Sequence, residues 1–128
     1  MSGDTKKSCP AKGSEDAILW AAENGLRVVF PQENQLLVDI DSPADRNTFD
    51  QNRDVVEEAY GIADESSAPS RSGGRKEHII VTLERAITPL ERIALQAVLG
   101  SDRRREAHSL RRLLAGEERP TLFFEKSK

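Results

Sequence analysis

The sequence predicts a single small α+β domain in which a mostly antiparallel sheet carries helices on one face, as in RRM-like and ferredoxin-like proteins. Two observations lead to this prediction. Segments with a helical repeat of apolar residues alternate with short runs rich in β-branched residues, in the order α-β-β-α-β-α-α-β. The chain has 128 residues, which is the usual length of one domain.

The first elements follow from capping residues and apolar runs. Residues 1–13 are polar and lack periodicity, so we expect a disordered tail before a folded domain of residues 14–128. Ser14 is expected to cap a first helix that ends at Gly25. Two apolar runs then predict strands, at 26–30 and 35–41.

Two further helices carry strong start signals. Ser42, with proline directly after it, predicts a helix that runs to about Tyr60 and ends at Gly61. Thr88 begins the same pattern and predicts a helix up to Gly100. The buried sides are expected to hold Phe49, Val56, Ala59 and Tyr60 in the first of these helices, and Leu90, Ile93, Ala94, Ala97 and Val98 in the second.

The remaining segments complete the domain. Residues 64–76 are polar and predict a flexible connection before a strand at 78–83. Ser101 or Asp102 is expected to cap a last helix, and residues 121–124 predict a short terminal strand. The last helix is expected to turn its apolar side inward, with Ala107, Leu110, Leu113 and Leu114.

Charge is distributed unevenly along the chain. The net charge is −3, but residues 1–69 sum to −8 and residues 70–113 to +5. The positive part offers either a cationic face for phosphates or an ordinary solvated surface. No apolar run suits a membrane span or a signal peptide, and the lone Cys9 can form no internal disulfide. We therefore expect a cytoplasmic protein without a membrane partner.

Two aspartates on one strand and a histidine on another are expected to meet on the open face of the sheet. Side chains alternate along a strand, so Asp39 and Asp41 share the face opposite Ile40 and lie about 6.7 Å apart. The same alternation brings His78 to this face. Carboxylate oxygens on a rigid strand suit Mg²⁺ or Mn²⁺. Alternatively, Asp41 only ends the strand and Asp39 only faces solvent.

The segment before the histidine contains groups that suit phosphate. Its sequence, SRSGGRKEH, has two glycines that let a backbone approach an anion closely. Hydroxyl and cationic side chains beside the glycines can donate hydrogen bonds to a triphosphate. These nucleotide-binding candidates are Ser72, Arg75, Lys76 and His78. The alternative is a flexible polar loop.

The two motifs and the helix between them resemble the archaeo-eukaryotic primase superfamily, the primase–polymerases, over about residues 35–83. The matching segments are LLVDID and SGGRKEHIIV. The resemblance implies an RRM-like catalytic core, here in a minimal or degenerate form. It implies that Asp39 and Asp41 are catalytic metal ligands and that Ser72 and His78 contact the nucleotide. A second protein subunit that completes the site is compatible with this short chain.

The last helix adds a third carboxylate and a basic stripe. The resemblance implies a further metal ligand, for which Asp102 is the candidate, although Asp102 suits a helix cap better. The stripe consists of Arg104, His108, Arg111 and Arg112. Its arginines, together with Arg71, can neutralise nucleic-acid phosphates. The alternative is a solvated amphipathic face.

These features predict a primase–polymerase-like domain that binds divalent metal and a nucleoside triphosphate. Its expected role is in DNA replication or repair, by nucleotidyl transfer if it is active, with DNA or RNA as a partner. Two alternatives remain: a non-catalytic nucleic-acid-binding or regulatory module on the same scaffold, and a protein–protein adaptor. Walker, Gly-x-Ser-x-Gly, His-Glu-x-x-His and Cys-x-x-Cys motifs are absent from the sequence.

Overall fold

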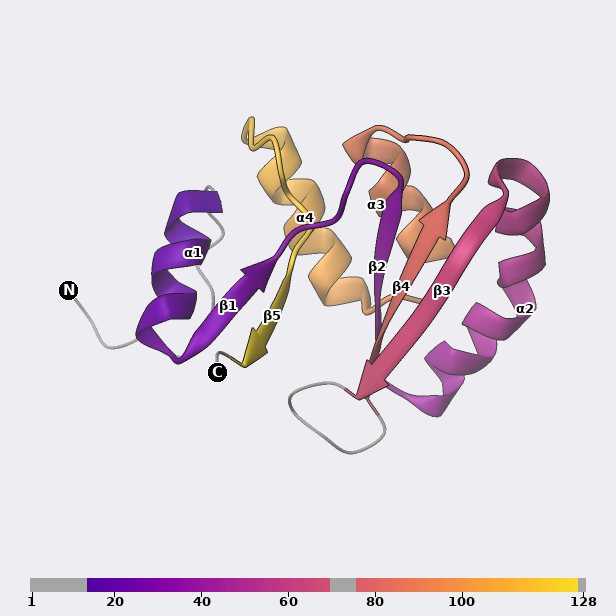
Figure 1. The fold of residues 1–128 in the computed structure, drawn as a ribbon, viewed down its shortest axis with the longest axis horizontal. Helices are drawn as coiled ribbons and strands as arrows, with labels where there is room; N and C mark the ends of the chain where they lie inside the picture. The colour runs from indigo at the N-terminus through magenta and orange to yellow at the C-terminus, as the bar shows by residue number, and fades with distance from the viewer. Residues whose placement is uncertain (1–13, 70–75, 127–128) are drawn as a thin grey trace.

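The computed structural model describes residues 14–69 and 76–126, which form an α+β fold (Figure 1). The elements are α1 (Ser14–Glu23), β1 (Leu26–Val29), β2 (Gln35–Ile40), α2 (Pro43–Tyr60), β3 (Ile62–Pro69), β4 (Glu77–Leu83), α3 (Pro89–Val98), α4 (Arg103–Leu114) and β5 (Phe123–Lys126). The expected fold class is confirmed. None of the helices that the structure describes is long and apolar enough to cross a membrane.

The larger sheet has the strand order β2-β4-β3, with both pairs antiparallel. This is the order of the first three strands of a ferredoxin-like β-α-β-β-α-β fold. The prediction of a flexible connection was wrong for residues 64–69, because β3 continues to Pro69 and pairs with β4, while residues 70–75 lie outside the described residues. Every side chain from Ala63 to Ala68 is exposed, so this edge strand has no apolar alternation that the sequence could reveal.

The main core lies on the face of the sheet that α2 and α3 cover. Alternate residues of β2 and β4, represented by Val38 and Val81, pack there against Phe49 and Val56 of α2 and Leu99 after α3. These side chains are at most 1 % exposed. The alternation that the sequence predicted for both strands is therefore confirmed.

The start signals of α2 and α3 act as the sequence predicted. The Ser42 Oγ accepts a hydrogen bond from the Asp45 N–H at 3.2 Å, and α2 ends at Gly61 with φ of 76°. The Thr88 Oγ1 and the Glu91 carboxylate form a reciprocal capping box. Such caps satisfy backbone donors that the first turn of a helix leaves without partners.

The buried sides of the helices differ from the prediction, most of all in α3 and α4. Buried polar side chains face the interior: Arg92 and Gln96 of α3, and Glu106, Ser109 and Arg112 of α4. Several apolar residues that were expected inside are exposed: Ala59 of α2, Leu90, Ala94, Ala97 and Val98 of α3, and Ala107, Leu110 and Leu114 of α4. The inward side of α4 is therefore polar, whereas that of α3 combines Arg92 and Gln96 with Ile93, which is buried as predicted.

The edge of β2 that has no neighbouring strand explains these buried polar side chains. β2 pairs with β4 on one side only, so the backbone groups on its other side need partners. The Leu37 N–H donates to the Gln96 side chain at 2.8 Å, and the Leu37 carbonyl accepts from Arg105 at 2.7 Å. The Asp39 N–H donates to the Ser101 Oγ at 3.0 Å. Side chains of α3, of α4 and of Ser101 between them thus take the place of a fourth strand.

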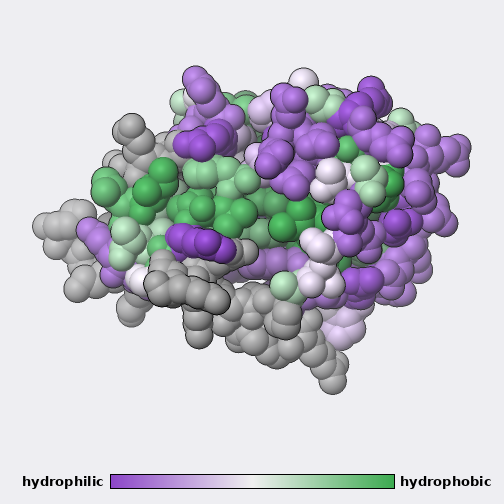
Figure 2. Space-filling model, in the orientation of Figure 1, coloured by the Kyte–Doolittle hydropathy of each residue, from purple (hydrophilic) through white to green (hydrophobic). Residues whose placement is uncertain are grey.

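The two ends of the described chain form a second, two-stranded sheet, in which β1 pairs antiparallel with β5. β5 begins two residues later than the strand predicted at 121–124. On the face shown in Figure 2, apolar side chains form a band over β1 and β5 toward β2, whereas the side formed by β3 and α2 is hydrophilic. Phe123 extends from this second sheet onto the open face of the first.

Candidate functional site

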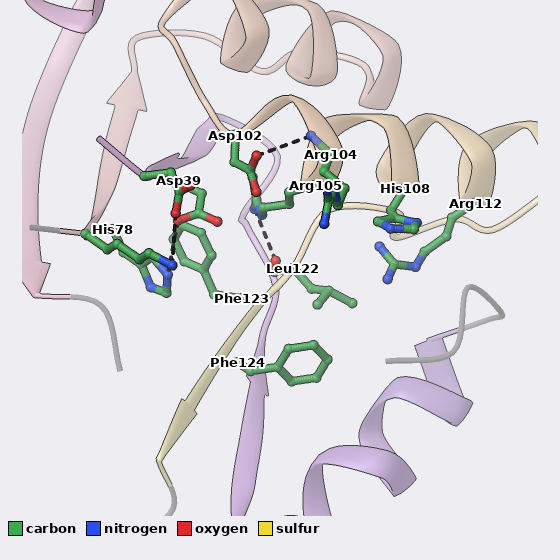
Figure 3. A pocket seen from close by; sticks show the side chains of 12 residues that line it. Asp39, His78, Asp102, Arg104, Arg105, His108, Arg112, Leu122, Phe123 and Phe124 are labelled. Atoms are coloured by element: carbon green, nitrogen blue, oxygen red, sulfur yellow. Dashed lines mark hydrogen bonds and ion pairs between the residues drawn. The ribbon is translucent and has the colours of Figure 1, made fainter. Parts of the chain in front are cut away.

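A pocket of about 310 Å³ lies where the open face of the larger sheet meets α4 and the segment that leads into β5 (Figure 3). Its lining includes three carboxylates, Asp39, Asp41 and Asp102. The cationic and imidazole side chains are Lys76, His78, Arg104, Arg105, His108 and Arg112. Leu122, Phe123 and Phe124 form an apolar wall. The pocket therefore offers carboxylate, cationic and apolar groups to one ligand.

Strand β2 positions the two aspartates on the pocket side, as the alternation predicted, because Ile40 between them is fully buried in the core. The Asp39 Oδ1 lies 3.7 Å from the His78 Nε2, and the Asp41 Oδ1 lies 3.2 Å from the Lys76 Nζ. Asp39 is the less exposed of the two, with 22 % of its side chain accessible against 47 % for Asp41.

The surroundings of Asp39 disfavour the charged form of its carboxyl. Burial raises the pKa of its carboxyl above 3.8, the nearby Asp102 and Asp41 raise it further, and Arg105 partly offsets this rise. Charged carboxylates lose hydration on burial and repel one another, so both effects favour the protonated form. A cation bound beside Asp39 and Asp41 would reverse this preference.

His78 lies directly opposite Asp39 in the antiparallel register of β2 and β4. Its ring stacks on Phe123, with centroids 3.8 Å apart and 7° between the planes. The Arg105 guanidinium lies over the same phenyl ring, 4.6 Å from its centroid. The open face of the sheet is therefore partly covered by Phe123, a contact that no pattern in the sequence indicates.

The basic stripe of α4 divides between two environments. Arg104, His108 and Arg112 lie one turn apart and line the pocket, whereas Arg111 is exposed outside it. The expectation that Arg112 belongs to an outward basic stripe was wrong, because Arg112 is buried and donates to the Pro120 carbonyl at 3.2 Å. Burial, together with the neighbouring arginines, lowers the pKa of His108 below 6.5.

Arg105 is a pocket residue that the sequence did not predict. It donates to the carbonyls of Leu37 and Leu122 and to the Glu106 carboxylate, which links β2, α4 and the segment before β5. Helical periodicity contains no signal for it, because the leucines of this helix were expected inside. A helix with its leucines inside would have placed Arg105 on the side away from the sheet.

Asp102 caps α4, the role that its position in the sequence favoured. Its carboxylate accepts from the Arg104 N–H at 3.3 Å, and its own N–H donates to the Asp39 carbonyl at 2.8 Å. The carboxylate also lines the pocket. Among the described residues, no three His, Cys, Asp or Glu side chains are grouped closely enough to hold a metal ion.

Three of the predicted phosphate-binding residues lie outside the described residues: Arg71, Ser72 and Arg75. The predicted tail of residues 1–13 does so as well. Lys76 and His78, from the same motif, are described and both line the pocket. The structure thus brings together two parts of the predicted site, the aspartate pair and the end of the glycine-containing segment.

Fold and site define an α+β protein with ferredoxin-like strand order and a mixed-charge pocket beside the edge strand β2. Comparison of the chain with models of known protein families, with curated proteins and with solved structures gives no match. The chemistry of the pocket itself therefore carries the functional interpretation.

Proposed function

We propose that the pocket binds a nucleoside triphosphate together with Mg²⁺ or Mn²⁺, and that the protein is a small primase–polymerase-like domain acting in DNA replication or repair. One observation carries this proposal. The aspartates of β2 and the cations of two other segments line the same pocket, although they are far apart in the sequence. Carboxylates suit a divalent cation, and the cations suit phosphates.

Asp39 and Asp41 are the residues that would hold the metal. Both are oxygen donors on one strand, and the charge repulsion around Asp39 is relieved by a cation. Because the described residues offer no third ligand in a close group, the remaining coordination positions would belong to water and to phosphate oxygens. A metal bound there supplies a Lewis acid that stabilises negative charge on phosphate oxygens.

The nucleotide phosphates have donors on two sides of the pocket. Lys76 and His78 approach from the start of β4, and Arg104 and His108 approach from α4. Arg105 is already bound to the backbone and to Glu106, so its role is to hold the pocket wall in position. In nucleotidyl transfer, a primer 3′-hydroxyl would attack the α-phosphorus and lose its proton to water, while the bond to the leaving pyrophosphate breaks. Lys76 and Arg104 would stabilise the negative charge on the phosphate oxygens.

The proposal is tested by thermal unfolding with Mn²⁺ and a nucleoside triphosphate, added singly and together. A ligand at about 100 times its Kd stabilises the fold by about 2.7 kcal/mol, which is a shift of several degrees. We expect the largest shift with both ligands, and we expect the Asp39→Asn/Asp41→Asn variant to lose it. The matched control is Asp54→Asn/Asp64→Asn, which changes two exposed carboxylates outside the pocket.

Two outcomes would contradict the proposal. The first is no joint shift in the unmodified protein. The second is an equal shift in the unmodified protein and in the Asp39→Asn/Asp41→Asn variant, because binding would then lie elsewhere. A joint shift that depends on the aspartates leads to a second assay, extension of a labelled primer by the same protein preparations, which separates catalysis from binding.

A further inference from the structure

The outward side of α3 is apolar, and the outward side of α4 combines exposed leucines with the exposed Arg103, Arg104 and Arg111. Leu90 is 58 % exposed and Val98 43 % on α3, while Leu110 is 37 % exposed and Leu114 80 % on α4. The two helices are packed against one another, with α3 behind the larger sheet and α4 beside β2 in Figure 1. We call the exposed apolar residues of both helices the α3–α4 stripe; its members are Leu90, Ala94, Val98, Ala107, Leu110 and Leu114.

The stripe follows from the helical spacing of each segment. Leu90, Ala94 and Val98 recur every four residues along α3, and Ala107, Leu110 and Leu114 recur every three or four along α4. The inward sides of the same helices are occupied by side chains that bind the edge of β2 and one another, such as Gln96 and Glu106. Exposure of the stripe is therefore fixed by interactions within the fold.

Two possible occupants of the stripe are disfavoured by chemistry. The segments outside the described residues, MSGDTKKSCPAKG, SRSGGR and SK, contain no Leu, Ile, Val or Phe to fill it. A second copy would form a two-fold interface in which one surface faces itself. Arg103 and Arg111 are exposed beside the stripe, and neither is ion-paired to a described residue, so a second copy would bring like charges together.

We propose that the α3–α4 stripe is the docking surface for an acidic amphipathic helix of another protein. An apolar face on such a helix would cover Leu110 and Leu114, and carboxylates along its flank would pair with Arg103 and Arg111. Apolar contact supplies affinity, while opposite charge sets the choice and orientation of the partner. This inference does not rest on the proposed nucleotide site, because its leucines and arginines on α4 do not line the pocket.

The test uses two synthetic helix-forming peptides that differ only in charge. Both carry leucines along one face; one has glutamates beside them and the other has lysines. We expect the acidic peptide to shift the backbone NMR signals of α3 and α4, with affinity about tenfold higher than that of the basic peptide. Arg103→Glu/Arg111→Glu should reverse this preference, and high salt should reduce it.

Serine variants separate the stripe from other apolar positions. The Leu110→Ser/Leu114→Ser variant should lose binding of the acidic peptide. The control variant Leu19→Ser, which changes an exposed leucine of α1, should bind this peptide as the unmodified protein does. Leu114→Ser alone serves if the double variant does not fold, because Leu114 is 80 % exposed. Equal binding of both peptides, shifts confined to other elements, or no binding would overturn the proposal. So would a dimer in sedimentation that Leu114→Ser dissolves, since the occupant would then be a second copy.

Discussion

Asp39 is the residue at which stability and the proposed function oppose one another. Its carboxyl is partly buried among Asp41, Asp102 and Glu106, and burial is the largest of the effects that raise its pKa. A raised folded-state pKa means that the fold binds this proton more tightly than the unfolded chain does. Stability is therefore lost as pH rises from the ordinary pKa of 3.8 through the folded value.

The first prediction is that Asp39→Asn raises the midpoint of thermal unfolding at about pH 7, where the charge is present, and leaves it unchanged at about pH 3, where the carboxyl is protonated. The asparagine keeps the size of the side chain and removes its charge. Circular dichroism melts at both pH values measure the effect, with Asp54→Asn as an exposed control. A lower midpoint at neutral pH would mean that attraction to Arg105 outweighs the cost of burial.

His108 provides a prediction about pH and anion binding. Burial and the charges of Arg112, Arg111 and Arg104 lower its pKa below 6.5, so the imidazole is neutral at neutral pH. A bound polyphosphate favours the protonated ring, so binding should take up a proton. Affinity for inorganic tripolyphosphate should therefore rise as pH falls through the pKa of the free protein, and His108→Gln should weaken this rise.

Calorimetry in two buffers of different ionisation enthalpy measures that proton uptake directly. Comparing the unmodified protein with His108→Gln at each pH removes the contribution from the phosphate's own titration. Identical pH profiles for both proteins would exclude His108 from the binding site.

At the scale of elements, the edge of β2 determines how α3 and α4 are oriented. Glu106 accepts hydrogen bonds from Gln96, Ser101 and Arg105, and these three side chains in turn bind the backbone of β2. Glu106 itself is 5 % exposed. The buried Glu106 carboxylate thus binds all three side chains that hydrogen-bond to the backbone of Leu37 and Asp39.

The corresponding prediction is that Glu106→Ala lowers the free energy of unfolding by about 3 kcal/mol, because it leaves the partly buried Arg105 without its anionic partner. Glu106→Gln keeps one acceptor and should cost less. Urea denaturation measures both, and Glu118→Ala, at an exposed position, should stay within about 0.5 kcal/mol of the unmodified protein. A small effect of Glu106→Ala would show that the hydrogen bonds from Gln96, Ser101 and Arg105 to β2 persist without this carboxylate.

The same edge explains what the sequence could and could not predict. Helix starts at Ser42 and Thr88 depend on local capping chemistry, and strand faces depend on local alternation, so both were predicted correctly. The inward side of α4 depends on which backbone groups of β2 lack a partner strand. These groups are far from α4 in the sequence, so local patterns do not report them. Amphipathic periodicity located the two sides of that helix but assigned them the wrong way round, and it therefore missed Arg105 while overestimating the exposure of Arg112.

For the candidate site, alternation along β2 and β4 was enough to predict that Asp39, Asp41 and His78 share one face of the sheet. The contribution of Phe123 could not be predicted, because it depends on pairing between β1 and β5, the first and last strands of the chain. Their register joins Leu26 to Lys126, a separation that short-range patterns do not report.

At the scale of the whole molecule, the chain consists of two packed units joined at the pocket. The sheet of β1 and β5, with α1 against it, has only two strands, and such a sheet is marginal by itself. It is attached to the larger unit by Phe123, which lies between His78 and Arg105, and by the bond from Arg105 to the Leu122 carbonyl. The residues that attach the smaller unit to the larger one therefore also line the pocket.

This arrangement predicts that Phe123→Ala releases the smaller unit before the larger one. The ring is 3 % exposed, and its removal should cost about 3 kcal/mol. Native-state hydrogen exchange should then speed up at the amides of β1 and β5, while β2 and β4 stay protected, because their ladder does not involve Phe123. Phe123→Leu, which keeps most of the apolar volume, should have a smaller effect. Faster exchange by an equal factor in both sheets would instead show that the two units unfold as one, and that the pocket forms only with the complete fold.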